Sequence, residues 1–92
     1  MIVSNEPGFY LTGKYGIRIE NLCEIVTGTA EHFYTMADLT LVPYARNLID
    51  KKLLTPSEIS WIDAYHQTIY DLLGSALSSE VKIWLKQATA GL

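Results

Sequence analysis

The stretch SNEPGFYLTGKYGIRIEN, residues 4–21, places two glutamates beside a predicted turn and on a predicted strand. Near its start, Pro7 and Gly8 fit the two central positions of a type II turn. Proline presets φ at the first of these positions, and glycine accepts a positive φ at the second. Such a turn would hold the preceding carboxylate, Glu6, at the end of a short strand. A carboxylate placed in this way usually serves a site, so the neighbouring strand is of interest.

The second half of the stretch opens the strongest strand candidate, residues 17–27. Ile17 and Ile19 point to one face of this strand, and Arg18 and Glu20 point to the other. This alternation is typical of a strand with one apolar and one polar face. It places a second carboxylate, Glu20, beside an arginine.

Shorter extended segments surround this strand. They are predicted at residues 2–5, 9–12 and 39–42, the last of them ended by Pro43. Gly13 and Gly16 bracket a further turn, and the segments before it are close enough in sequence to pair antiparallel with residues 17–27. Residues 28–38 are mixed and show no clear period.

The clearest helix is predicted to begin at Thr55. This residue is a good N-cap, Pro56 fits the first helical position, and Glu58 completes a capping box. Positions at alternating spacings of three and four form one stripe: Ile59, Ile62, His66, Ile69 and Leu73. Gly74 is the natural C-terminal stop.

A second helix is predicted from Ser79 to about Ala88. Its inner face is expected to carry Val81, Trp84, Leu85 and Ala88. The two helices would form a short helical hairpin. One helical turn is also expected within residues 44–54, around Asn47-Leu48-Ile49.

Strands followed by helices make an α+β arrangement. We expect a partial antiparallel sheet over residues 1–43 and a helical extension over residues 44–92. Because the sheet has only three or four strands, its edges would be exposed. A length of 92 residues suggests one domain or part of one.

Composition excludes several classes of protein. The net charge of −3 argues against a nucleic-acid partner, which needs a basic face. No apolar run approaches the roughly 20 residues of a membrane helix, and the N-terminus does not resemble a signal peptide. A single cysteine, Cys23, rules out an internal disulfide and fits a reducing compartment. The hydrophobic content of 49% indicates apolar surface meant for a partner or a further domain.

Glu6 and Glu20 are the candidate site residues that the pattern itself provides. Two convergent carboxylates suit a divalent cation such as Mn²⁺, or acid–base work. A solvated turn glutamate and a polar sheet face that includes Arg18 would account for the same residues without any site, and the pattern alone does not decide. Two ligands are also fewer than the three or more of a catalytic metal centre.

The other potential ligands show no recognisable spacing: His32, Asp38, Asp50, Asp63 and His66. His66 lies on the helix stripe, so we interpret it as a core or interface histidine. Cys23 faces the same way as Ile17 and Ile19 and is interpreted as a packing residue. The helical aromatics are expected to pack the hairpin or an interface: Trp61, Tyr65, Tyr70 and Trp84.

The motifs SNEPGFY and GIRIEN closely resemble the last two metal-ligand motifs of the aminopeptidase P group of metallopeptidases. These enzymes remove an N-terminal residue that precedes proline, and they have the pita-bread fold of prolidase, creatinase and methionine aminopeptidase. The segments TLVPYARNLID, LLTPSEISWIDAYH and IWLKQATAGL resemble the helical C-terminal extension of the longer aminopeptidase P enzymes. The resemblance covers nearly the whole chain, and the extension makes a prolidase or creatinase the weaker reading.

The resemblance implies a role for each of four residues. Glu6 would bind one metal ion and Glu20 would bridge two. Tyr10 and Arg18 would act as catalytic residues near the substrate and the metal-bound water. The complete enzyme would hold two divalent metal ions, with Mn²⁺ favoured and Zn²⁺ or Co²⁺ as alternatives, and these ions would activate the water that attacks the Xaa–Pro carbonyl.

The family's other ligands, two aspartates and a histidine, lie upstream of the EPG motif, as do its substrate-binding histidines. This chain has only five residues before that motif. We therefore expect the C-terminal part of a larger cytoplasmic enzyme, inactive and without stably bound metal by itself. The substrates of the complete enzyme would be peptides with proline at the second position.

A non-catalytic interaction or dimerisation module derived from the same fold is the alternative function. It would bind a partner, such as a second copy of the chain, through exposed sheet edges or the helical hairpin. The retention of Glu6, Tyr10, Arg18 and Glu20 favours the enzyme, because a pure scaffold has no reason to keep all four.

Overall fold

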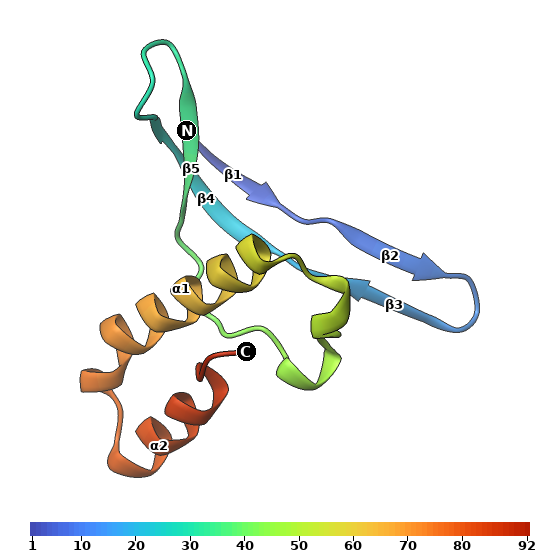
Figure 1. Ribbon diagram of the computed structural model, residues 1–92, viewed down its shortest axis with the longest axis vertical. Helices are drawn as coiled ribbons and strands as arrows, with labels where there is room; N and C mark the ends of the chain where they lie inside the picture. The colour runs from blue at the N-terminus through green and yellow to red at the C-terminus, as the bar shows by residue number, and fades with distance from the viewer. The chain divides into compact units, whose positions relative to one another are not determined.

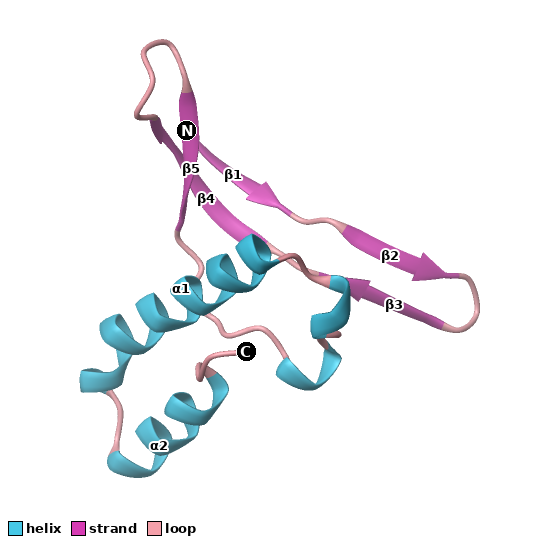
Figure 2. Cartoon of the chain, in the orientation of Figure 1, coloured by secondary structure: helices cyan, strands magenta, loops and turns pink.

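The computed structural model describes residues 1–92 and divides into two compact units, residues 1–41 and 42–92. The first unit contains the strands β1 (Ile2–Asn5), β2 (Gly8–Leu11), β3 (Tyr15–Arg18), β4 (Asn21–Thr27) and β5 (Tyr34–Asp38) (Figure 1). The second contains the helices α1 (Pro56–Leu73) and α2 (Ser79–Ala88), with the 3-10 turns η1 (Arg46–Leu48), η2 (Lys51–Leu53) and η3 (Gly74–Ala76) (Figure 2). All strand pairs are antiparallel. The predicted α+β class is confirmed.

One register runs through the whole length of the first hairpin. β1 pairs with β4 so that Asn5 lies opposite Asn21, and β2 pairs with β3 so that Gly8 lies opposite Arg18. Two residues separate the paired strands on each side, so neither side carries an insertion. The Ile19 N–H donates to the Pro7 carbonyl at 3.1 Å and carries the pairing across the gap. In Figure 1 the hairpin is a single long ribbon, with β1 and β2 along one side and β3 and β4 along the other.

The predicted type II turn at Pro7 and Gly8 is wrong. The chain does not reverse there, because Gly8 opens β2 and the ladder continues. Proline is tolerated because the ladder uses its carbonyl, and it has no N–H to leave unpaired. The reversal lies at Gly13, which has a φ of +73°, and the Lys14 N–H closes the turn on the Leu11 carbonyl at 3.0 Å.

The strand predicted at residues 39–42 is also wrong. β5 lies earlier, at Tyr34–Asp38, and pairs with β4 to give the sheet order β1-β4-β5. Residues in β5 are mostly exposed, so the sequence lacks the alternation of apolar and polar residues from which a strand is predicted. Past its end, the Leu39 N–H still donates to the Leu22 carbonyl at 2.8 Å, and the Leu22 N–H donates to the Thr40 hydroxyl at 2.8 Å.

The predicted start of the first helix is confirmed. The Thr55 hydroxyl accepts from the Glu58 N–H at 3.2 Å, and the Glu58 carboxylate accepts from the Thr55 N–H at 2.7 Å. The predicted stripe is the least exposed face of α1, with His66 and Ile69 fully buried. Gly74 follows the last residue of α1, but its backbone stays right-handed and the chain continues into η3.

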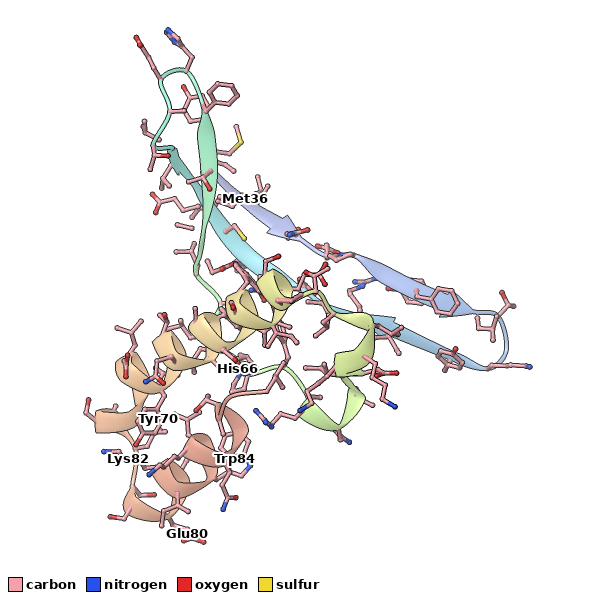
Figure 3. All side chains as sticks on the ribbon, in the orientation of Figure 1. Met36, His66, Tyr70, Glu80, Lys82 and Trp84 are labelled. Atoms are coloured by element: carbon pink, nitrogen blue, oxygen red, sulfur yellow. The ribbon has the colours of Figure 1, made fainter.

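The second helix matches its predicted bounds, Ser79–Ala88, and its predicted inner face is right at Leu85 and Ala88 and wrong at Val81 and Trp84. Leu85 is buried, whereas Val81 is 44% exposed and Trp84 is 59% exposed. Figure 3 shows Lys82 beside Tyr70, and the Lys82 ammonium lies 6.0 Å from the centre of the Tyr70 ring. The contact of α2 with η3 and the end of α1 therefore uses a face that includes Lys82.

Candidate metal and catalytic site

The first hairpin has one polar face, and it carries every residue that the sequence nominated for the site. Strand alternation puts positions two apart on the same face, and directly paired residues share a face. Tyr10 is paired with Gly16, and Gly8 with Arg18. The register that continues across the gap puts Glu6 opposite Glu20. Glu6, Tyr10, Arg18 and Glu20 therefore lie on one face.

Opposed carboxylates are an unusual choice for a sheet. Directly opposite residues have Cβ atoms about 4.5–5.5 Å apart, and like charges in such a pair destabilise it. Both glutamates are exposed, so water screens part of the repulsion. The arrangement is unfavourable for a simple sheet surface, and it is suited to a positive charge held between Glu6 and Glu20.

Arg18 provides part of that positive charge. Its Nε–H donates to the Tyr10 hydroxyl at 2.7 Å, and its Nη1 atom lies 3.4 Å from Glu6 Oε1. The pKa of the Arg18 guanidinium is raised, first by the hydrogen bond to Tyr10 and then by the negative charges of Glu6 and Glu20. Arg18 therefore forms an ion pair with Glu6, and its charge also attracts Glu20 more weakly.

A fifth residue, Ser4, belongs to the same cluster. Its hydroxyl donates to Glu6 Oε2 at 2.6 Å, so the two oxygens of this carboxylate face different partners. Sequence reasoning missed Ser4. The available signal was its position two residues before Glu6, which places both side chains on one face of a strand.

The opposite face of the hairpin is apolar and uncovered in this chain. It carries Phe9, Leu11, Tyr15, Ile17 and Ile19, whose exposed fractions range from 40% to 58%. Phe9 and Tyr15 contact each other with ring centroids 6.1 Å apart.

The remaining candidate ligands do not join the site. No group of three or more His, Cys, Asp or Glu side chains is placed to hold a metal ion. His32 lies in an exposed turn with a φ of +66°, 3.5 Å from the Glu31 carboxylate. Cys23 is buried against Asn21 and Asp38, as its interpretation as a packing residue requires, and burial raises the pKa of its thiol.

His66 is a core residue, as predicted. Its ring is fully buried, and Nε2 accepts from the Tyr44 N–H at 3.1 Å. Tyr44 also stacks on Tyr65, with ring centroids 5.1 Å apart, and Trp61 stacks on the other aromatic residues while remaining half exposed. These contacts fasten the segment before η1 onto α1.

No helix combines the length and the hydropathy that a membrane span requires.

Comparison with known proteins agrees with these observations. A family model described as the C-terminal region of peptidase M24 matches residues 32–92. The chain belongs to this family. The similarity to curated proteins extends further and includes the hairpin. A probable Xaa-Pro aminopeptidase P of Fusarium vanettenii is 43% identical over 97% of the chain, and the Xaa-Pro aminopeptidase app-1 of Caenorhabditis elegans is 40% identical over 95% of it.

The fold agrees as well. The crystal structure of an X-prolyl aminopeptidase from Caenorhabditis elegans matches 99% of this chain with a TM-score of 0.91 and 36% identity. That protein is described as a cytosolic enzyme with a di-nuclear active site. This chain covers 16% of its length and 15–16% of the two curated relatives. The predicted likeness to the C-terminal part of an aminopeptidase P, with its pita-bread fold, is confirmed.

Proposed function

We propose that this chain supplies the C-terminal part of a metal-dependent Xaa-Pro aminopeptidase, a hydrolase that cleaves the bond between an N-terminal residue and proline. One observation carries the proposal: Glu6 and Glu20 oppose each other on a sheet face that also holds Tyr10 and Arg18. The relatives named above are Xaa-Pro aminopeptidases, and their similarity includes this hairpin.

The donor set fits a divalent metal centre in its chemistry. Carboxylate oxygens are suitable ligands for Mn²⁺, and a cation bound between two opposed carboxylates would offset their repulsion. Glu6 would hold one ion and Glu20 would bridge two. When bound, the ions supply Lewis-acid stabilisation and lower the pKa of water. We propose Mn²⁺, with Zn²⁺ or Co²⁺ as alternatives.

Tyr10 and Arg18 would act beside these ligands. Because the Tyr10 oxygen accepts the Arg18 Nε–H, its own O–H remains available to donate to a substrate or a water molecule. The Arg18 guanidinium has five N–H donors in a fixed fork, so it can hold Tyr10 and Glu6 and still offer a donor to a substrate. The substrates would be peptides with proline at the second position, and the complete enzyme would be cytoplasmic.

The 92-residue chain would not complete the site by itself, since a catalytic metal centre takes at least about three protein ligands. Isothermal titration of Mn²⁺ into the purified chain should show weak or absent binding that Glu20→Ala leaves unchanged. Xaa-Pro peptides should not be cleaved. Tight binding that Glu20→Ala abolishes would show that the chain, alone or as a dimer, forms a complete site. That result would contradict the proposal that other parts of the enzyme supply the remaining metal ligands.

The uncovered apolar face favours a second candidate function, a dimerisation module that binds another copy of the chain. A two-stranded hairpin is marginal in water unless something packs on it, and free strand edges invite pairing. Sedimentation velocity over a range of concentrations tests this candidate. Self-association that Ile17→Lys reduces would support it, and a monomer at every concentration would count against it.

A further inference from the structure

Gly8 and Gly16 stand inside strands, where glycine is a poor choice. Glycine weakens a strand because it has no side chain to pack and loses more backbone entropy than other residues. A positive φ would justify it, but neither residue has one, and Gly13 is the glycine of this hairpin that does. The reason for both glycines must therefore lie in the space above them.

That space is filled by the ring of Tyr10. A Cβ atom placed on Gly16, the cross-strand partner of Tyr10, would lie 2.5 Å from Tyr10 Cδ1. A Cβ placed on Gly8 would lie 2.7 Å from the Tyr10 hydroxyl and 2.8 Å from Cε2. Real Cβ atoms essentially never approach other atoms so closely, so a methyl group at either position would move the ring.

The two glycines act on different ends of the same side chain. Gly16 lies under the part of the ring near its attachment, so a methyl group there lifts the whole ring. Gly8 lies under the hydroxyl end, so a methyl group there moves the oxygen that accepts from Arg18 Nε at 2.7 Å. The Arg18 guanidinium carbon lies 5.9 Å from the centre of the same ring, so a displacement of the ring would change this contact as well.

We propose that Gly8 and Gly16 are positioning residues. Because neither has a side chain, the Tyr10 ring can lie flat against the backbone of both strands, with its hydroxyl held against Arg18. The inference about geometry concerns the folded chain alone. Its consequence for catalysis rests on the proposed function, in which Tyr10 and Arg18 act next to the metal ligands.

The arginine Nε–H signal in a nitrogen-15 NMR spectrum reads out this hydrogen bond without metal, substrate or activity. Arg18 and Arg46 are the two arginines of the chain, so Arg46→Lys assigns the signals. In Gly16→Ala and Gly8→Ala, we expect the Arg18 Nε–H signal to move toward its position in Tyr10→Phe, which keeps the ring and lacks the hydroxyl. Its exchange with solvent should accelerate about two- to tenfold, the range expected for loss of one hydrogen bond.

Gly74→Ala is the matched control. A Cβ on Gly74 would meet its nearest neighbour, Lys82 Cε, at an ordinary 3.6 Å, so the Arg18 signal should not move. An unchanged Arg18 signal and exchange rate in Gly16→Ala would overturn the proposal. Because no metal or substrate is present, this result is independent of whether the complete protein is a peptidase.

A double-mutant cycle covers the case in which Gly16→Ala damages the hairpin as a whole. If the added methyl group is harmful because it meets the Tyr10 ring, Gly16→Ala should lower the melting temperature less in a Tyr10→Ala background than in the unmodified chain. An equal loss in both backgrounds would mean that the ring is not what Gly16 accommodates, and would overturn the proposal.

Discussion

Three residues lie in positions that lower the stability of the folded chain: Glu6, Glu20 and His66. The two glutamates lie opposite each other with like charges, and Arg18 forms an ion pair with Glu6 at 3.4 Å. His66 is buried in the core as a neutral imidazole. Its Nε2 accepts a hydrogen bond from a backbone N–H, and its Nδ1 has no hydrogen-bond partner. Departures from local rules are expected at functional sites, and the opposed charges of Glu6 and Glu20 are such a departure, whereas His66 is explained by its place in the core.

Removing one of the opposed carboxylates should stabilise the chain in the absence of metal. We expect Glu20→Gln to raise the melting temperature at neutral pH by about 1–5 °C, because it relieves the repulsion of Glu6. The matched control is Glu24→Gln on β4, where the paired residues are Ile2 and Ala37 and no like charge is relieved. A melting temperature that falls in Glu20→Gln at low salt would contradict the opposed arrangement.

His66 should make stability depend on pH. Burial lowers its pKa, with Arg46 adding to the shift and Asp63 opposing it. The unfolded chain therefore binds a proton more readily than the folded chain, and stability is lost as pH falls below the usual histidine pKa of about 6.5. The melting temperature should drop between pH 7.5 and 5, and His66→Gln should flatten that drop. His32→Gln, at an exposed histidine, should leave it unchanged, and an equal flattening in both variants would contradict the account.

At the scale of elements, the sequence predicted what local signals specify. The capping box of α1, its buried stripe and the bounds of α2 depend on residues within a few positions of each other, and all three are confirmed. β5 and the course of the chain at Pro7 depend on a partner strand distant in sequence, and both were mispredicted. On α2, Val81 and Trp84 were mispredicted as inner residues for the same reason, because packing against η3 and the end of α1 selects the inner face.

The capping box offers a direct measurement at this scale. Thr55→Ala removes the hydroxyl that accepts from Glu58 and should lower the free energy of unfolding by about 1 kcal/mol. Urea denaturation followed by circular dichroism measures the change. Thr68→Ala is a matched control in the same helix, because the Thr68 hydroxyl donates to the Ala64 carbonyl within the helix and caps no helix end. This substitution should change the free energy of unfolding by less than about 0.5 kcal/mol. Equal losses would show that the cap does not fix the start of α1.

The site itself was only partly predictable. Spacing put Arg18 and Glu20 on one strand face, but a turn at Gly8 would have separated Glu6 from them. The continuous register across Pro7 and Ile19 brings the two glutamates opposite each other. The register of a hairpin is fixed by its turn, so the turn predicted at Gly8 in addition to the one at Gly13 gave the wrong register for Glu6.

At the scale of the whole molecule, the chain has two compact units and an exposed apolar face, and it spans about one sixth of the enzymes it resembles. The hairpin of the first unit carries the opposed glutamates, and the family model matches the second unit together with the end of the first. We therefore propose that residues 4–20 contribute to the metal site and that the remaining ligands come from other parts of a larger enzyme.

A chimeric enzyme would show whether Glu6 and Glu20 hold the metal. Residues 1–92 would replace the matching segment of the Caenorhabditis elegans X-prolyl aminopeptidase, and the chimera would be assayed for bound metal and for release of the first residue of an Xaa-Pro peptide. We expect metal content and cleavage close to those of the parent, a loss of at least about 100-fold in cleavage and of bound metal in Glu6→Gln and Glu20→Gln, and no change in Glu24→Gln. A folded, active chimera whose metal content and activity survive both glutamate substitutions would contradict the account.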